Sequence, residues 1–83
     1  MSYANNYSDE GTISGDKVIT FPWKPKELQI TNDSTTKDFN YKFNESEEYR
    51  TLKPYETSTL YNISIRSLYI AGDTVAYRIW GLG

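Results

Sequence analysis

The sequence TSTLYNISIRSLYIAGDTVAYRIW, residues 57–80, carries the strongest pattern in the chain and decides its fold class. Odd-numbered residues up to Ile65 share one face, whereas the next apolar residues, Leu68 and Ile70, fall on even numbers. A period of two is typical of strands, and a change of phase by one residue requires a bulge or tight corner, here near 66–67. The stretch therefore predicts antiparallel strands rather than a helix.

The second half of this stretch predicts a turn and a last strand. Residues 71–74 (AGDT) are typical of a hairpin turn, and residues 75–80 (VAYRIW) of the strand that follows it. Both faces of that strand carry apolar side chains, which favours a central strand or one covered by a partner. On this pattern we expect Trp80 and Tyr61 in the core.

Shorter strands are predicted upstream, at residues 17–21, 27–31, 38–44 and 49–52. The third alternates most cleanly, so Phe39 and Phe43 are expected in the core. No window has a convincing helical period. Six or seven short strands separated by turn signals predict an all-β fold, a small antiparallel β-sandwich, Ig-like or jelly-roll-like, over residues 12–83. Residues 1–11 are polar and aperiodic, and predict a flexible N-terminal arm before this single domain.

Composition excludes several classes of function. The 83 residues carry a net charge of −2 and contain no Cys and no His. The sequence therefore has no disulfide framework, zinc site of the usual kind, thiol nucleophile or Ser-His-Asp triad. The charge balance argues against nucleic-acid binding, and no apolar run is long enough for a membrane span. The acidic residues of 44–48 predict a solvated turn and match no recognised calcium loop. We expect no enzyme activity, no cofactor and no metal.

Aromatic side chains are the main candidates for binding. The chain has 2 Trp, 8 Tyr and 3 Phe but few aliphatic residues, so aromatic side chains must fill much of the core. A chain of this length buries barely enough apolar area to be stable alone, which favours oligomerisation. Exposed, rigid aromatics can instead stack on a sugar ring or anchor a protein interface. The candidates are Tyr3 and Tyr7 in the arm, Trp23 between two prolines, Tyr55 in a turn and Tyr69. For Trp23, packing within the domain and an interface role both stay open.

Four stretches resemble a known group of proteins. They are PKELQITNDS (25–34), KDFNYKFN (37–44), the turn LKPYET (52–57) and SIRSLYIAGDTVAYRIWGLG (64–83). Together they resemble small β-sandwich virion proteins of tailed bacteriophages, which have an LKPGE-like turn and a terminal strand close to YRIWGxG. Tyr55 stands where such turns often place Gly. The resemblance implies a structural component of the phage head or tail, such as a capsid decoration protein or a fibre-associated module, and carries over no functional residue.

Two functions are weighed. The first is a non-enzymatic phage virion structural protein that binds the capsid or tail surface through aromatic and edge-strand interfaces. Its partners would be other virion proteins and copies of itself. Such a protein is assembled into virions in the bacterial cytoplasm, which fits the absence of cysteine and of a secretory signal. The alternative is a carbohydrate-binding module that recognises host-surface glycans through coplanar aromatics, with Trp23, Tyr55 and Tyr69 as candidates.

Overall fold

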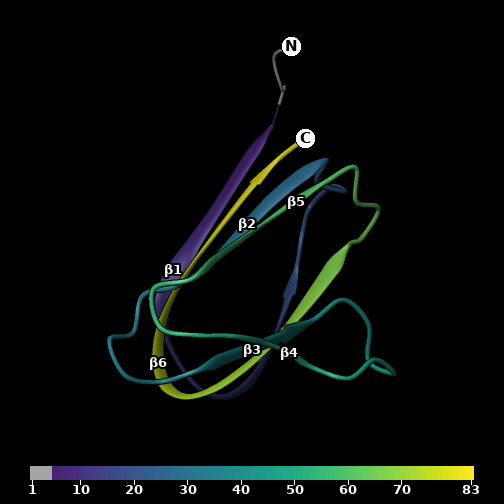
Figure 1. Ribbon diagram of the computed structural model, residues 1–83. Helices are drawn as coiled ribbons and strands as arrows, with labels where there is room; N and C mark the ends of the chain where they lie inside the picture. The colour runs from purple at the N-terminus through teal and green to yellow at the C-terminus, as the bar shows by residue number, and fades with distance from the viewer. Residues whose placement is uncertain (1–4) are drawn as a thin grey trace.

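A computed structural model describes residues 5–83, which form an all-β domain (Figure 1). Its strands are β1 (Asn6–Thr20), β2 (Glu27–Asn32), β3 (Phe39–Lys42), β4 (Arg50–Leu52), β5 (Thr57–Tyr61) and β6 (Ser67–Leu82). The described residues contain no helix, and therefore none long and apolar enough to cross a membrane. The predicted fold class, all-β with antiparallel pairing, is confirmed.

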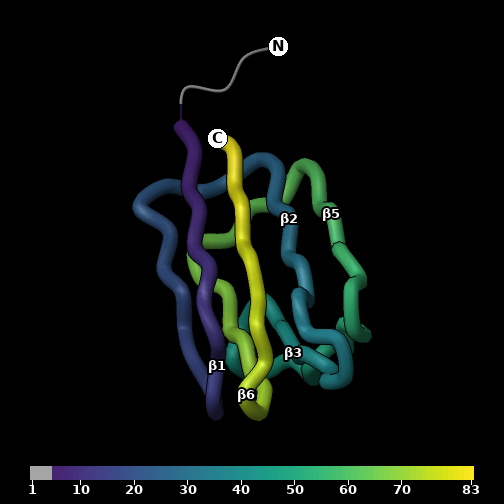
Figure 2. The backbone as a smooth tube through the Cα atoms, turned by 90° about the vertical axis from the view of Figure 1, so that its left-hand side faces the viewer, coloured from purple at the N-terminus to yellow at the C-terminus, as the bar shows by residue number. Residues whose placement is uncertain are grey.

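The centre of the sheet is the long strand β6. It pairs along its whole length with β1, and on its other side with β3 near one end and β2 near the other. The strand order is β4-β3-β6-β2-β5, with β1 on the free side of β6. Figures 1 and 2 show that the paired β1 and β6 bend back together, which curls the six-stranded sheet into a half-barrel.

The bend replaces the hairpin turn that the sequence predicts at 71–74. The register shifts between Ile13 and Ser14, which pair with Val75 and Asp73, so Thr74 is an extra residue on β6. Thr74 has a φ of 56° and Gly15 a φ of 102°. Such a bulge bends a strand without ending it. The expectation of a turn was therefore wrong, because β1 crosses the bend beside β6 and keeps it paired.

The bend divides the sheet into two halves. The β2 half contains residues 6–13 and 75–82 with β2 and β5, and the β3 half contains residues 14–20 and 67–73 with β3 and β4. The inner faces of the halves pack on each other and bury the apolar side chains Ile13, Ile19, Phe21, Leu28, Ile30, Phe39, Tyr41, Leu52, Leu68, Ile70, Val75, Tyr77 and Ile79. One continuous sheet thus supplies both walls of the core.

A buried amide fixes the corner where β2 ends. Asn32 is fully buried, and its Nδ2 donates to the carbonyl oxygens of Lys37 and Leu52 at 2.8 and 2.9 Å. Its Oδ1 accepts from the backbone N–H of Ser34 at 2.8 Å. Its backbone N–H donates to Glu56 at 2.9 Å. All of its polar groups are paired, so the loop after β2, the end of β4 and the turn before β5 are held together.

The structure differs from the predicted arm. Residues 6–11 belong to β1 and pair with residues 77–82, and Asn5 exchanges two backbone hydrogen bonds with Gly83, at 2.7 and 3.0 Å. Pairing with β6 satisfies one edge of the backbone of this polar segment, whose sequence gives no strand period. Residues 1–4, and with them Tyr3, lie outside the described residues.

Candidate functional site

The curled sheet leaves the outer sides of both halves uncovered by any other element of the described chain. We name the outward side chains of the β2 half the Trp80 face. They include Ser8 and Glu10 of β1, Arg78 and Trp80 of β6, Glu27, Gln29 and Thr31 of β2, and Thr57, Thr59 and Tyr61 of β5. The strand register places them in rows, one running Ser8–Trp80–Gln29–Thr59 and the next Glu10–Arg78–Thr31–Thr57.

Two large aromatic side chains on this face were expected in the core. Trp80 is 40% exposed and Tyr61 64% exposed, so both expectations were wrong. The reason is strand parity: Val75, Tyr77 and Ile79 occupy the inner side of β6, which turns Trp80 outward. In β5, Leu60 packs against the core and Tyr61 faces the opposite side.

Arg78 on the Trp80 face is paired with Asp33, the residue that follows β2. Arg78 donates two hydrogen bonds to the Asp33 carboxylate, from Nε at 2.6 Å and from a terminal nitrogen at 3.0 Å. This contact raises the pKa of Arg78 above its ordinary value. Glu10 lies opposite Arg78 in the register. The guanidinium therefore has acidic neighbours within the protein and does not stand as a free cation.

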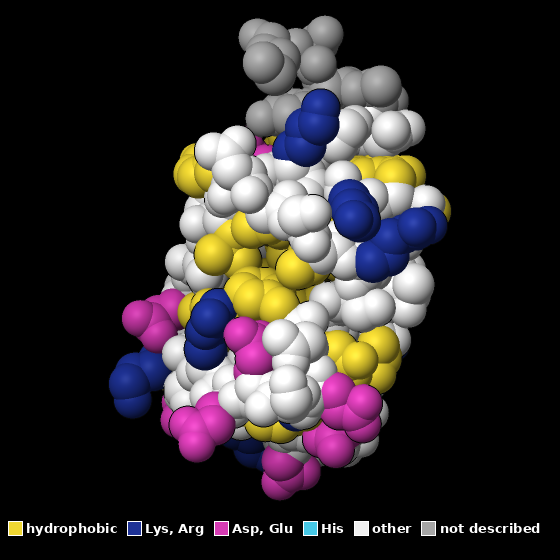
Figure 3. All heavy atoms as spheres, turned by 90° about the vertical axis from the view of Figure 1, so that its right-hand side faces the viewer, with side chains coloured by type: hydrophobic (Ala, Val, Ile, Leu, Met, Phe, Trp, Pro, Cys, Tyr) yellow, Lys and Arg dark blue, Asp and Glu magenta, His cyan; other side chains and the backbone are white. Residues whose placement is uncertain are grey.

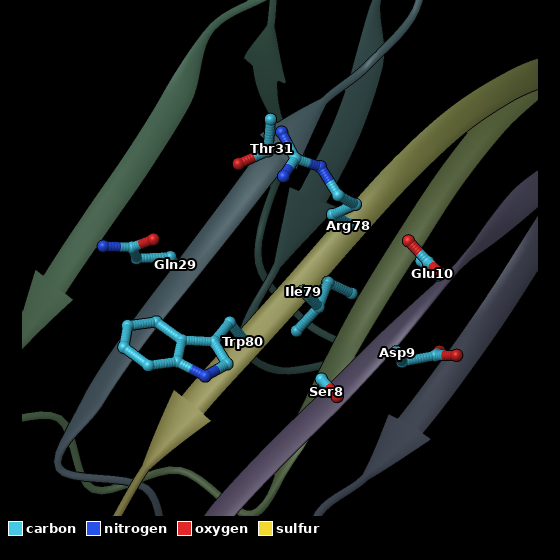
Figure 4. A pocket seen from close by; sticks show the side chains of 8 residues that line it. All are labelled: Ser8, Asp9, Glu10, Gln29, Thr31, Arg78, Ile79 and Trp80. Carbon is cyan, nitrogen blue, oxygen red and sulfur yellow. The ribbon is translucent and has the colours of Figure 1, made fainter.

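A hollow of about 720 Å³ lies on this face and is shown in Figure 4. Its lining combines aromatic and polar side chains: Ser8, Asp9, Glu10, Gln29, Thr31, Arg78, Ile79 and Trp80. In Figure 4 the indole of Trp80 extends toward β2 beside Gln29, with the broad side of its ring turned to the viewer. Six of the eight lining residues are polar or charged, so the hollow is a polar surface beside one exposed aromatic ring.

The second surface is more apolar. We name the group Val18, Lys42, Tyr49 and Tyr69 on the outer side of the β3 half the Tyr69 face. Tyr69 pairs with Val18 on one side and Lys42 on the other. The ammonium of Lys42 lies 4.5 Å from the ring centroid of Tyr49 and 5.8 Å from that of Tyr69. Val18 is 52% exposed and Tyr49 40% exposed. Burial, and secondarily the charge of Asp16, raise the pKa of Tyr49.

A hollow continues the Tyr69 face toward the loop before β6. It is lined by Phe43, Asn44, Ser64, Ile65, Arg66, Ser67 and Tyr69. Figure 3 views the molecule from the side opposite to Figure 2 and shows hydrophobic side chains gathered in a central hollow. Phe43 and Ile65 are partly buried and pack against the core. Four of the seven lining residues are polar or charged, so this hollow has partly buried apolar side chains beside polar ones.

The aromatics predicted as partner-binding do not form one site. Tyr7 is half-buried, with its ring edge-on to Phe21 at 5.1 Å, and its burial raises its pKa. Trp23 packs on Gly83, because a Cβ added there would lie 2.6 Å from an indole carbon. Tyr55 is 69% exposed in the turn at the other end of β2. Of the described candidates, only Tyr69 lies on one of the two outer faces.

The chemical groups on the two faces are aromatic rings, hydroxyls, amides and a few charges. Within residues 5–83 no group of three or more acidic, His or Cys side chains could hold a metal ion. On the Trp80 face the hydroxyls of Thr31 and Thr57 hydrogen-bond to each other at 3.0 Å. Both faces therefore carry aromatic and polar side chains on paired strands.

Comparison with known proteins gives a likeness in fold. No family model matches the chain, and no curated protein matches it. Among solved structures, it is similar to the solution NMR structure of a de novo designed double-stranded β-helix, with a TM-score of 0.53 and 10% sequence identity. The match covers 96% of this chain and 100% of that one. At this identity the likeness concerns the fold alone.

Proposed function

We propose that this chain is a non-enzymatic structural protein of a tailed-phage virion that binds the capsid, as a decoration or cement protein, or the tail surface. The observation that carries the proposal is the Tyr69 face, where exposed Val18 lies opposite Tyr69 and the Lys42 ammonium lies over the rings of both Tyr49 and Tyr69. Exposed apolar side chains gathered on one face are typical of an interaction surface. Aromatic side chains are enriched at the centres of protein interfaces. The resemblance of residues 25–83 to phage virion proteins supports the choice of partner.

Strand edges supply a second means of attachment. β4 and β5 end the strand order, and β1 pairs only with β6. Their free backbone N–H and C=O groups would accept a strand from a neighbouring subunit, as in β-strand addition. The short edges β4 and β5 would add few hydrogen bonds, so aromatic contacts on the Tyr69 face would provide most of the affinity.

We also propose that copies of the chain form a closed homo-oligomer on the particle, and that the half-barrel is equivalent to a jelly-roll-like sandwich. The jelly-roll-like description is supported by the two facing halves of the sheet and by the likeness to a double-stranded β-helix.

Light scattering after size-exclusion chromatography tests the homo-oligomer. A closed oligomer is expected, and a monomer at every concentration would contradict it.

The alternative, a carbohydrate-binding module, is supported by residues other than those the sequence suggested. Trp23 packs on Gly83, and Tyr55 and Tyr69 lie on different surfaces. Trp80 and Tyr61, in contrast, are exposed on one face of the sheet. A phage surface protein can have both properties.

The test is rebinding to particles from which the gene for the chain has been deleted. We expect the purified chain to rebind, and the double variant Val18→Ser/Tyr69→Ser to bind at least about tenfold more weakly, because both side chains lose interface burial. Tyr55→Ser, an exposed aromatic outside the Tyr69 face, is the matched control and should bind normally. Equal binding by the double variant, with its fold intact by circular dichroism, would remove the Tyr69 face from the proposal.

A further inference from the structure

We propose that the Trp80 face binds a neutral oligosaccharide, with one sugar ring stacked on the indole of Trp80 and a second contact at Tyr61. This site is distinct from the Tyr69 face, and the inference goes beyond attachment to a particle. It rests on the exposure of the two aromatics, the chemistry of the side chains between them, and the pairing of the local charges.

The indole is presented in the manner that sugar stacking requires. Trp80 is 40% exposed on a central strand, with neighbours on both sides that hold its backbone in place. Figure 4 shows the ring extending over the β2 side with its broad side uncovered among the labelled residues. A pyranose ring has a face of C–H bonds and a rim of hydroxyl groups, so stacking buries apolar area and leaves the hydroxyls free to bond.

The side chains beside the indole match that rim of hydroxyls. In the same row, Ser8, Gln29 and Thr59 are neutral hydrogen-bonding groups. A serine or threonine hydroxyl both donates and accepts, and a glutamine amide offers two donors and a carbonyl acceptor. The centres of protein interfaces are, in contrast, depleted in serine and in acidic side chains. The composition of this row therefore favours a polyhydroxylated ligand over a protein partner.

The charges favour a neutral ligand over an acidic one. The guanidinium of Arg78 is bonded twice to Asp33, Glu10 lies opposite Arg78 in the register, and Glu27 lies opposite Tyr61. An acidic sugar or a phosphate would have to displace the Asp33 carboxylate and approach Glu10. A neutral sugar does not have to displace Asp33 and is not repelled by Glu10. Its hydroxyl groups can also donate to the carboxylate oxygens of Asp33, which have further lone pairs.

The second aromatic indicates an oligosaccharide rather than a single sugar. Tyr61 on β5 is two strands away from Trp80 on β6, with β2 between them. Two strand spacings correspond to about 10 Å. A single ring on the indole would not cover that separation, whereas a chain of rings would. We therefore expect affinity to rise with the number of sugar rings until both aromatics are covered.

The test follows the fluorescence of Trp80. The Trp23→Phe variant leaves Trp80 as the only indole and is titrated with hexasaccharides of glucose, xylose, mannose and N-acetylglucosamine, and with hexagalacturonate as the acidic probe. We expect a saturable change with at least one neutral hexasaccharide, at least about tenfold weaker binding of its disaccharide, and no saturation with hexagalacturonate. By calorimetry on the otherwise unaltered chain, Trp80→Ala should lose at least about tenfold in affinity, and Tyr61→Ala a smaller factor.

Tyr55→Ala is the matched control, since it removes an exposed tyrosine at the turn before β5. It should bind the same hexasaccharide as the unaltered chain does. The inference is overturned if no neutral hexasaccharide saturates, or if folded Trp80→Ala binds as tightly as the unaltered chain. If Trp80→Ala instead loses particle binding while no sugar saturates, the face is a protein contact. The sugar titrations can be interpreted even if the Val18→Ser/Tyr69→Ser variant binds particles normally, because that variant alters the opposite face.

Discussion

The ring of Phe39 stacks on the ring of Tyr77, with 5.9 Å between their centroids and 17° between their planes. Phe39 lies on β3 and Tyr77 on the part of β6 that pairs with β2, so the contact joins the two halves of the curled sheet. The hydroxyl of Tyr77 accepts from Lys17 at 3.2 Å and donates to Asp9 at 3.1 Å. The bend is therefore held by side-chain contacts across the core as well as by the pairing of β1 with β6.

Replacing Phe39 by Ala should destabilise the fold by about 3 to 5 kcal/mol, because it removes a fully buried ring and leaves a cavity between the halves. Urea unfolding followed by circular dichroism measures the change. Phe43→Ala is the control: this ring is only partly buried beyond the end of β3 and should cost less. Equal costs for the two variants would contradict the placement of Phe39 at the centre of the core.

Asn32→Ala should cost about 2 to 4 kcal/mol, although the side chain is small. The variant leaves the carbonyls of Lys37 and Leu52 and the N–H of Ser34 without their side-chain partner in a buried corner. Asn44→Ala provides the comparison, since that exposed asparagine also accepts from a backbone N–H two residues later. A loss below about 1 kcal/mol for Asn32→Ala would mean that water replaces its bonds without strain.

Tyr55→Gly should stabilise the protein by about 1 kcal/mol. Tyr55 has a φ of 66°, a left-handed conformation that costs most side chains about 1–2 kcal/mol and glycine very little. The loss of its ring should matter little, because the side chain is exposed. Tyr61→Gly, also an exposed tyrosine but within β5, should destabilise. Thermal unfolding of both variants distinguishes conformational strain from the loss of a tyrosine; a lower midpoint for Tyr55→Gly would rule out the strain.

Stability should fall as the pH rises above about 10. Hydrogen bonding to Tyr77 and the charge of Asp9 raise the pKa of Lys17 above 10.5, and burial raises the pKa of Tyr7 above 10.0. When the pKa of a group is higher in the folded state, the folded state binds its proton more tightly than the unfolded state does. The resulting contribution to the free energy of unfolding is complete below the ordinary pKa and is lost as the pH rises through the raised pKa.

Urea midpoints between pH 8 and 12 measure this loss. Lys17→Gln and Tyr7→Phe should each reduce the slope of the urea midpoint against pH, because each removes a group that binds its proton more tightly in the folded state. Slopes identical to that of the unaltered chain in both variants would show that the alkaline loss has another origin.

Alternation in the sequence was sufficient to predict the short strands. The strands at 27–32 and 39–42 were predicted because one side of each is buried and the other is more exposed. The strand at 50–52 was predicted from the turn that follows it, since its own residues do not alternate in burial. The first half of β1 was missed because its polar residues gain their partner only from β6, more than sixty residues away. The residues of the AGDT segment (71–74) are typical of a turn. Because β1 pairs with β6 on both sides of this segment, it is a bend within a continuous strand.

The candidate surfaces were predicted less well than the fold. Aromatic character alone does not tell which side of a strand faces the core, so Trp80 and Tyr61 were assigned inward. The alternation Val75, Tyr77, Ile79 was the signal that places Trp80 outward, provided that only one side of β6 is covered. The Tyr69 face joins residues from β1, β3, β6 and the segment before β4, a combination that depends on strand order.

The protein content of purified particles tests the proposal that this chain is a structural component of a tailed-phage virion. Particles of the phage or prophage that encodes the chain are purified on a density gradient, and their proteins are quantified by mass spectrometry. We expect the chain in intact particles, in many copies and at a fixed ratio to the major capsid or tail protein. Its absence from particles, in cells that produce the chain, would contradict this role.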